Sequence, residues 1–114
     1  MESVEDGEEA FWDAVGPIMA ADDRLVEGTI MSSRCLRLAD GRAKPEFVAM
    51  PHHQQGGLVV KLPAHRVAEL IEAGQGQSFA PAGKVFKEWL AVVDHDENRW
   101  NDLLLEAVAF ADGA

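Results

Sequence analysis

The chain has 114 residues, of which 47% are hydrophobic, and its 20 acidic and 10 basic residues give a formal net charge of −10. This length fits one domain with one core, and the charge disfavours non-specific binding to nucleic acid. The single cysteine, Cys35, excludes an internal disulfide. Together with the lack of an apolar leader or a bilayer-length apolar run, it predicts a cytoplasmic protein that does not bind membranes.

The first residues are acidic and lead into a helix. We expect residues 1–7 to form a frayed, solvated tail. An apolar stripe predicts a helix over about 8–21, which either kinks at Gly16-Pro17 or breaks there and restarts at Pro17. The stripe consists of Phe11, Val15, Ile18 and Met19. Asp22-Asp23 and Glu27-Gly28 mark the exit from this helix.

The middle of the chain has the pattern of three strands. Residues 29–50 predict a hairpin around the turn signal Asp40-Gly41, followed by a loop over 51–56. From Leu58 to Leu62, apolar residues alternate with Val59 and Lys61, as in a strand with one face in the core. The connecting loops are too short for a crossover helix, so the three strands should be antiparallel.

A second helix follows directly. Pro63 suits a first helical position, and Val67, Leu70 and Ile71 recur at the spacing of one helical face. Gly74 is placed to end the helix.

The last third predicts two strands and a helix. Residues 78–80 are long enough only for an edge strand or loop, whereas 84–93 are apolar on both faces, so that strand is internal or meets a partner. Asp94 can cap the final helix, with Glu97 at its third position. Its core-facing stripe consists of Trp100, Leu103, Leu104, Ala107, Val108 and Ala111. The predicted fold is an α+β two-layer sandwich, α-β(3)-α-β(2)-α, with the helices on one face of an antiparallel sheet.

Three segments resemble the TfoX N-terminal-domain family. They are 58–66 (LVVKLPAHR), 79–89 (FAPAGKVFKEW) and, more weakly, 33–38 (SRCLRL), with the helix up to Gly74 included in the likeness. The chain departs from the family at residues 31–33, where relatives often carry a glycine and an aromatic residue. The resemblance implies one domain over residues 1–114 with the fold of YjbR-type and secretion-chaperone-like proteins. It also implies a regulatory role, since the namesake family is linked to natural competence, or DNA binding, which is often ascribed to YjbR-type proteins.

Four charged residues lie within the segments 58–66 and 79–89. Lys61 and Glu88 predict a cross-strand or strand-to-helix ion pair, which could include Arg66. The alternative is a site for an anion or a partner, formed by Lys61, Arg66, Lys87 and Glu88.

Other residues that could carry chemistry have simpler interpretations. His52-His53 and Asp94-His95-Asp96 could bind a metal, but exposed loop or cap positions fit them better, and no zinc spacing is present. Cys35 could be reactive beside arginines, but a lone cysteine in an apolar strand is usually a core residue. Trp89 and Trp100 lie on apolar stripes, which favours core packing over base stacking.

The sequence therefore predicts a non-enzymatic interaction or regulatory domain, with a protein partner or a second copy of the chain, and no cofactor or metal. Nucleic-acid binding is the first alternative and would need several basic residues on one face. These are Arg34, Arg37, Arg42, Lys44, Lys84 and Lys87. Small-anion binding and catalysis are the remaining alternatives, and no nucleophile–base motif or phosphate loop supports them.

Overall fold

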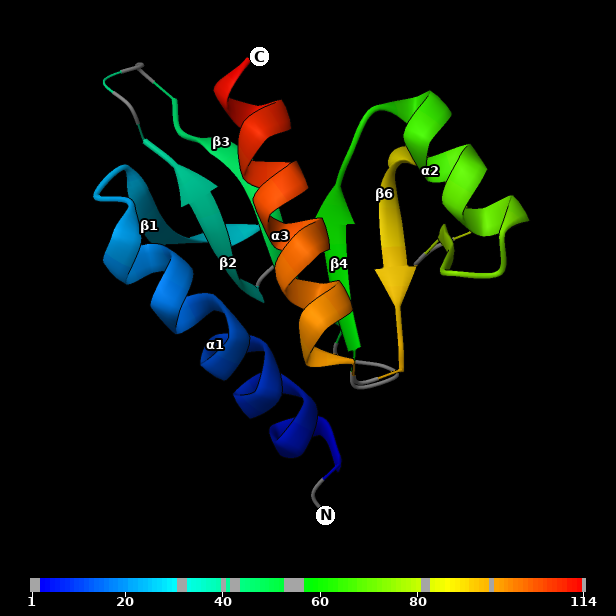
Figure 1. The fold of residues 1–114 in the computed structure, drawn as a ribbon, viewed down its shortest axis with the longest axis horizontal. Helices are drawn as coiled ribbons and strands as arrows, with labels where there is room; N and C mark the ends of the chain where they lie inside the picture. Colours follow the sequence, from blue (N-terminus) through cyan, green and yellow to red (C-terminus); the bar gives the residue numbers. More distant parts are fainter. Residues whose placement is uncertain are drawn as a thin grey trace.

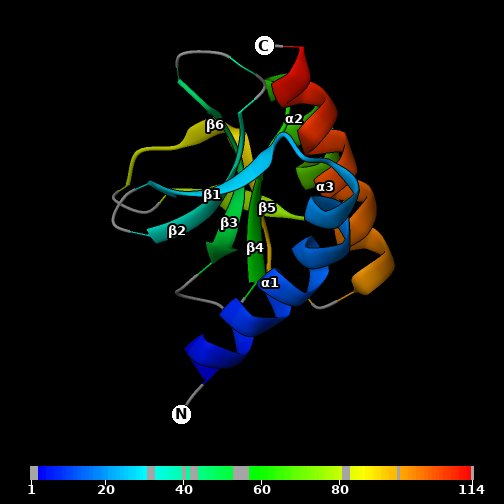
Figure 2. The same cartoon turned by 90° about the vertical axis from the view of Figure 1, so that its left-hand side faces the viewer.

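The computed structural model describes residues 3–30, 33–39, 41, 44–52, 57–80, 83–94 and 96–113, with side chains from Glu8 onward. In chain order the elements are α1 Ser3–Ala21, β1 Leu25–Ile30, β2 Ser33–Leu38, β3 Glu46–His52, β4 Gly57–Lys61, α2 Ala64–Glu72, β5 Gln77–Phe79, β6 Phe86–Val92 and α3 Glu97–Asp112. The strands form one antiparallel sheet in the order β1-β2-β3-β4-β6-β5, and the helices cover one face (Figures 1 and 2). The predicted α+β class is confirmed.

The described residues before α2 form four strands, not the three predicted, because β1 precedes the expected hairpin and pairs with β2 along its whole length. The prediction that Glu27-Gly28 marks a helix exit is wrong, since both residues lie inside β1. A glycine fits there because a Cβ at Gly28 would lie 2.7 Å from Cδ of Arg37. The Arg37 side chain therefore lies close against the backbone of β1.

The first helix begins at Ser3, earlier than predicted, and continues through Pro17 without a break. Gly16 and Pro17 are exposed, whereas Val15 and Ile18 are buried. The hydrogen bond that proline cannot make is therefore lost on the solvent side of α1, where water can replace it.

The second helix has the predicted buried face and the predicted glycine stop. Val67 and Leu70 are buried, and Ile71 packs at the edge of the core. Pro63 lies at the N-cap, one position before the expected one. Gly74 has φ +76°, and the amides of Gly74 and Gln75 donate to the carbonyls of Ile71 and Leu70, which is a Schellman motif.

The main core lies between the sheet and the helices. The sheet contributes Leu25, Leu36, Leu38, Val48, Ala49, Leu58, Val60, Leu90 and Val92. All six residues of the predicted α3 stripe are buried against this layer. The cap of α3 differs from the prediction: the Asp96 carboxylate accepts from the Arg99 amide at 3.2 Å, while the Asp94 carbonyl accepts from Trp100 Nε1 at 2.9 Å.

The opposite face of the sheet carries a second cluster, called here the aromatic cluster. It contains Cys35, Phe47, Met50, Val59, Phe79, Trp89 and Ala91, with Ile30 and Phe86 packed against it. Figure 2 shows β1, β2 and the start of β6 extending to the side of the sheet away from the helices. Large rings thereby cover the small side chains, and Cys35, Val59 and Ala91 have no exposed surface.

The two apolar faces of β6 are thus both internal. Leu90 and Val92 belong to the main core, and Trp89 and Ala91 belong to the aromatic cluster. Of the two interpretations of this strand, packing within the chain accounts for residues 89–92. An interaction surface must therefore be sought at the other end of β6.

Candidate functional site

Two adjacent hollows lie along the first half of β6. The apolar groove, about 200 Å³, lies between α2 and β6 and is lined by Ala64, Val67, Ala68, Ile71, Ser78, Val85, Phe86, Lys87 and Trp89. The lysine hollow, about 390 Å³, is lined by Lys61, Lys84, Val85, Phe86, Lys87, Glu88 and Trp89. Four residues line both, so the hollows form two parts of one candidate site.

Val85 is the most exposed apolar residue of this site. Its exposed fraction is 52%, and among the described residues only Leu105 on α3, at 49%, is a comparably exposed large hydrophobic residue. The two differ in surroundings, because Val85 lines the apolar groove together with Ile71 and Phe86, which are partly buried. Val85 is therefore part of an apolar surface, not an isolated exposed side chain.

The lysines of the site differ in how they are engaged. Lys61 Nζ donates to Glu46 Oε2 at 2.8 Å, across from β4 to β3. Lys84 and Lys87 are exposed and make no ion pair with any described residue. These two ammonium groups are therefore available to an incoming acidic group.

The predicted ion pair between Lys61 and Glu88 is wrong. Lys61 lies opposite Trp89 in the β4–β6 register, so Glu88 is not its directly opposed neighbour, and Lys61 pairs with Glu46 instead. Glu88 is exposed and borders the lysine hollow. The predicted set is thus only partly brought together: Lys61, Lys87 and Glu88 line one hollow, and Arg66 does not.

Arg66 instead joins α2 to α3. Its Nε donates to Glu106 Oε2 at 2.7 Å, and Nη1 lies 3.5 Å from Glu69 Oε1. The side-chain hydrogen bond to Glu106 has the largest effect and raises the pKa of Arg66 above its ordinary value, although burial acts to lower it. Arg66 is therefore a structural residue that fixes α2 beside α3.

The first turn of α2 borders the apolar groove through Ala64. The helix begins Ala64-His65-Arg66, so its first turn lacks the acidic residues that usually offset the positive end of a helix dipole. Its N-cap, Pro63, has no side-chain acceptor for the first amides. This end of the site thus adds a partial positive charge to that of the two lysines.

Trp89 forms the inner wall of the site and has no free ring face for a ligand. Its ring stacks on Phe47 at 4.5 Å and 17° and on Phe79 at 5.5 Å and 23°, and Phe86 contacts it at 4.9 Å. Only 8% of the residue is exposed. The prediction that Trp89 packs in a core is confirmed, and so is the same prediction for Trp100, which is 2% exposed.

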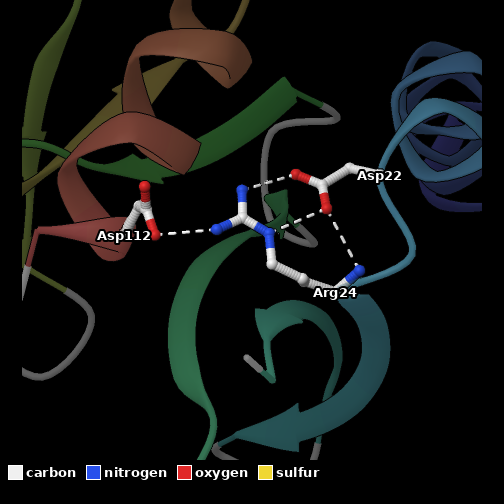
Figure 3. Close-up of polar contacts among 3 residues, drawn as sticks. All are labelled: Asp22, Arg24 and Asp112. Carbon is white, nitrogen blue, oxygen red and sulfur yellow. Dashed lines mark hydrogen bonds and ion pairs between the residues drawn. The ribbon is translucent and has the colours of Figure 1, made fainter. Parts of the chain in front are cut away.

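Most described arginines outside the site are held in structural contacts. Arg24 is the clearest example: Nη1 lies 2.7 Å from Asp112 Oδ1, and Nη2 lies 2.8 Å from Asp22 Oδ2, which ties the end of α3 to the α1–β1 connection (Figure 3). The side-chain hydrogen bond from Arg24 lowers the pKa of Asp22 to about 2. The network joins chain segments and engages all three guanidinium nitrogens of Arg24.

The other basic residues proposed for nucleic-acid binding do not converge with Lys84 and Lys87. Arg34 pairs with Glu27 and lies over the ring of Trp12, and Arg37 donates to the carbonyls of Pro45 and Thr29. Both belong to β2, which β3 and β4 separate from β6 in the sheet. Arg42 lies outside the described residues, and Lys44 is exposed after β2.

The candidates for metal binding and thiol chemistry have structural positions where they are described. His52 is buried in β3 with its ring 5.6 Å from that of Phe79, so the prediction of an exposed loop position is wrong for it. His53 and His95 lie outside the described residues. Within the described part of the chain, no three His, Cys, Asp or Glu side chains are grouped as metal ligands. Cys35 is confirmed as a core residue, and burial raises the pKa of its thiol.

A larger hollow, about 450 Å³, lies between α1 and the start of α3. Its charged residues are Asp13, Asp96 and Glu97, and Asp96 already caps α3. Carboxylates facing water are a common feature of a chain with this net charge, so this hollow is a weaker candidate for a binding site than the two hollows along β6.

The sequence patterns identified only part of the site. Lys61, Lys87 and Glu88 stand in recognisable strands, and Lys84 appears only among residues considered for nucleic acid. Val85 looks like one more core residue of an apolar strand, and only the structure places it outside the core, beside α2.

Comparison with protein-family models, characterised proteins and solved structures finds no match for this chain. The resemblance to the TfoX N-terminal-domain family therefore stays a prediction. No helix in the described part of the chain is long and apolar enough to span a membrane.

Proposed function

We propose that this domain is a non-enzymatic, regulatory interaction module of the cytoplasm, which binds a protein partner in the apolar groove beside β6. The observation that carries the proposal is the 52% exposure of Val85 on a groove whose walls are otherwise mostly apolar. Apolar surface rimmed by polar residues is typical of protein-binding sites, and covering it is favourable by about 25 cal/mol per Å². The resemblance to the TfoX family adds the expectation of a regulatory role.

Nucleic-acid binding has weaker support. A net charge of −10 repels phosphate, and Glu88 lines the lysine hollow together with Lys84 and Lys87. Trp89, the aromatic residue nearest to those lysines, has both ring faces occupied by Phe47 and Phe79, so it offers no platform for a base. Catalysis has weaker support still, because burial keeps the Cys35 thiol from acting as a nucleophile.

Peptide display tests the proposal. A random library of 12-residue peptides is selected against the purified domain, and the affinity of enriched peptides is measured by fluorescence anisotropy. Val85→Gln places a polar group on the groove and should weaken binding at least about fivefold. Leu105→Gln makes the same kind of change at a similarly exposed residue of α3 and serves as the matched control.

The proposal fails if no peptide is enriched, or if both glutamine variants bind enriched peptides equally well. Sedimentation velocity at micromolar concentration decides whether the partner is a second copy of the chain. A dimer that Val85→Gln dissociates and Leu105→Gln leaves intact would identify the groove as a self-association surface.

A further inference from the structure

We propose that the segment bound in the apolar groove is acidic, with apolar side chains that enter the groove beside carboxylates held by Lys84 and Lys87. This inference rests on the proposed function and specifies the chemistry of the partner. Its basis is the contrast between this site and the charge of the rest of the molecule.

The lysine hollow is positive on a strongly acidic chain. Its lining residues include three lysines and one glutamate, against a net charge of −10 for the whole chain. Lys61 is neutralised by Glu46, and Glu88 offsets one further charge, so Lys84 and Lys87 together leave the hollow with a net positive charge. A segment bearing carboxylates at this position would gain charge-assisted hydrogen bonds that the described residues do not supply.

Most other described basic residues are already engaged in contacts within the chain, which sets Lys84 and Lys87 apart. Arg24, Arg34, Arg66 and Arg99 each form at least one ion pair, and Arg37 donates to backbone carbonyls. Of the described basic residues, only Lys44, Lys84 and Lys87 lack such a contact. Two of these three stand at one hollow, next to the exposed Val85.

The end of α2 adds to the same charge. Ala64 lines the apolar groove at the N-terminus of the helix, where the first turn holds His65 and Arg66 and no acid. The positive end of the helix dipole therefore faces the groove region without an internal counter-charge from that turn. The lysines and the helix terminus favour the same sign of ligand, and the apolar walls require it to carry apolar side chains as well.

The composition of the selected peptides tests this inference. In the display experiment, enriched 12-residue peptides should combine Asp or Glu with Leu, Ile, Phe or Met. The double variant Lys84→Glu/Lys87→Glu should bind such a peptide about tenfold more weakly, because two attractive contacts become repulsive. Lys44→Glu changes the third unpaired lysine, outside the site, and should leave the affinity within about twofold.

The failure of this inference differs from the failure of the proposed function. Enrichment of basic or uncharged peptides, with binding sensitive to Val85→Gln but not to the lysine variants, overturns the inference and leaves the interaction module standing. Displacement of the peptide by a single-stranded oligonucleotide also overturns it, in favour of nucleic acid. Binding of a synthetic peptide with residues 1–12 of this chain, lost in the lysine double variant, would support it with a second copy as the source of the segment.

Discussion

Replacing the buried Trp89 by alanine should destabilise the domain more than replacing the half-buried Trp12. The Trp89 ring is sandwiched between Phe47 and Phe79, with centroids 4.5 Å and 5.5 Å away, and only 8% of the residue is exposed. Truncation of a buried Trp costs about 3 to 5 kcal/mol, and two lost stacked pairs put this variant at the upper end. A loss of about 5 kcal/mol in the free energy of unfolding would equal the whole stability of some domains of this size.

Urea unfolding followed by far-ultraviolet circular dichroism measures this loss without relying on tryptophan fluorescence. Trp12→Ala is the matched control, because Trp12 is half-buried, contacts Phe11 edge-on and lies under Arg34, and should cost about 1 to 2 kcal/mol. If Trp89→Ala does not fold, Trp89→Phe is measured instead: its smaller ring can still stack on Phe47 and Phe79, so this variant should retain part of the stability. Equal losses for the two alanine variants would refute the view that the aromatic cluster is a second core, and would leave Trp89 open to a ligand role.

Three further predictions concern single residues. Gly57→Ala places a Cβ 1.9 Å from a backbone oxygen of β6 and should cost about 3 kcal/mol in urea unfolding, whereas Gly16→Ala, with no atom within 4 Å, should be neutral or stabilising. Because Asp22 has its pKa lowered to about 2, its contribution to stability is present above pH 4 and is lost as the pH falls toward 2. Unfolding of an Arg24→Gln variant, measured over this range, should lack that part of the pH dependence. The Cys35 thiol, buried and with a raised pKa, should react with a disulfide reagent only when the protein unfolds, and rapid reaction of the native protein would contradict its core position.

The elements with strong periodicity could be predicted from the sequence. The stripe on α3 and the residues Leu58 and Val60 of β4 lie in the main core as expected, because a repeating apolar pattern and burial on one face have the same physical origin. The prediction that β4 has only one face in a core is wrong, since Val59 is buried on the other face in the aromatic cluster. The glycine stop after α2 could also be predicted, since Gly74 adopts a positive φ that other residues disfavour.

β1 could not be predicted, because an edge strand carries little pattern. Only Leu25 in β1 is fully buried, and the sequence through Glu27, Gly28 and Thr29 resembles a polar connection. What makes this segment a strand is its pairing with β2 and the space that Gly28 leaves for Arg37, and both depend on residues distant in the sequence.

The candidate site was only partly predictable for a related reason. The sequence places Lys61 and Glu88 on two strands of one sheet, which is why it predicts an ion pair between them. The register instead sets Lys61 opposite Trp89 and places Glu46 within reach of its ammonium group. The exposure of Val85 depends on where β6 begins, at Phe86, and element boundaries are set by pairing partners more than by composition.

Net charge and local charge act on an acidic partner over different distances. The Debye length is about 30 Å at 0.01 M salt, close to the 34 Å extent of the molecule, so at this ionic strength the full charge of −10 repels an approaching acidic segment. At 0.1 M salt it is about 10 Å, and the charges close to the bound segment, chiefly Lys84 and Lys87, then dominate. The association rate of an acidic peptide should therefore rise with salt up to about 0.1 M, while its affinity falls at higher salt as the lysine contacts are screened. An acidic segment with no contact to these lysines would show only the first of these effects, so the salt profile separates attraction at the site from repulsion by the molecule as a whole.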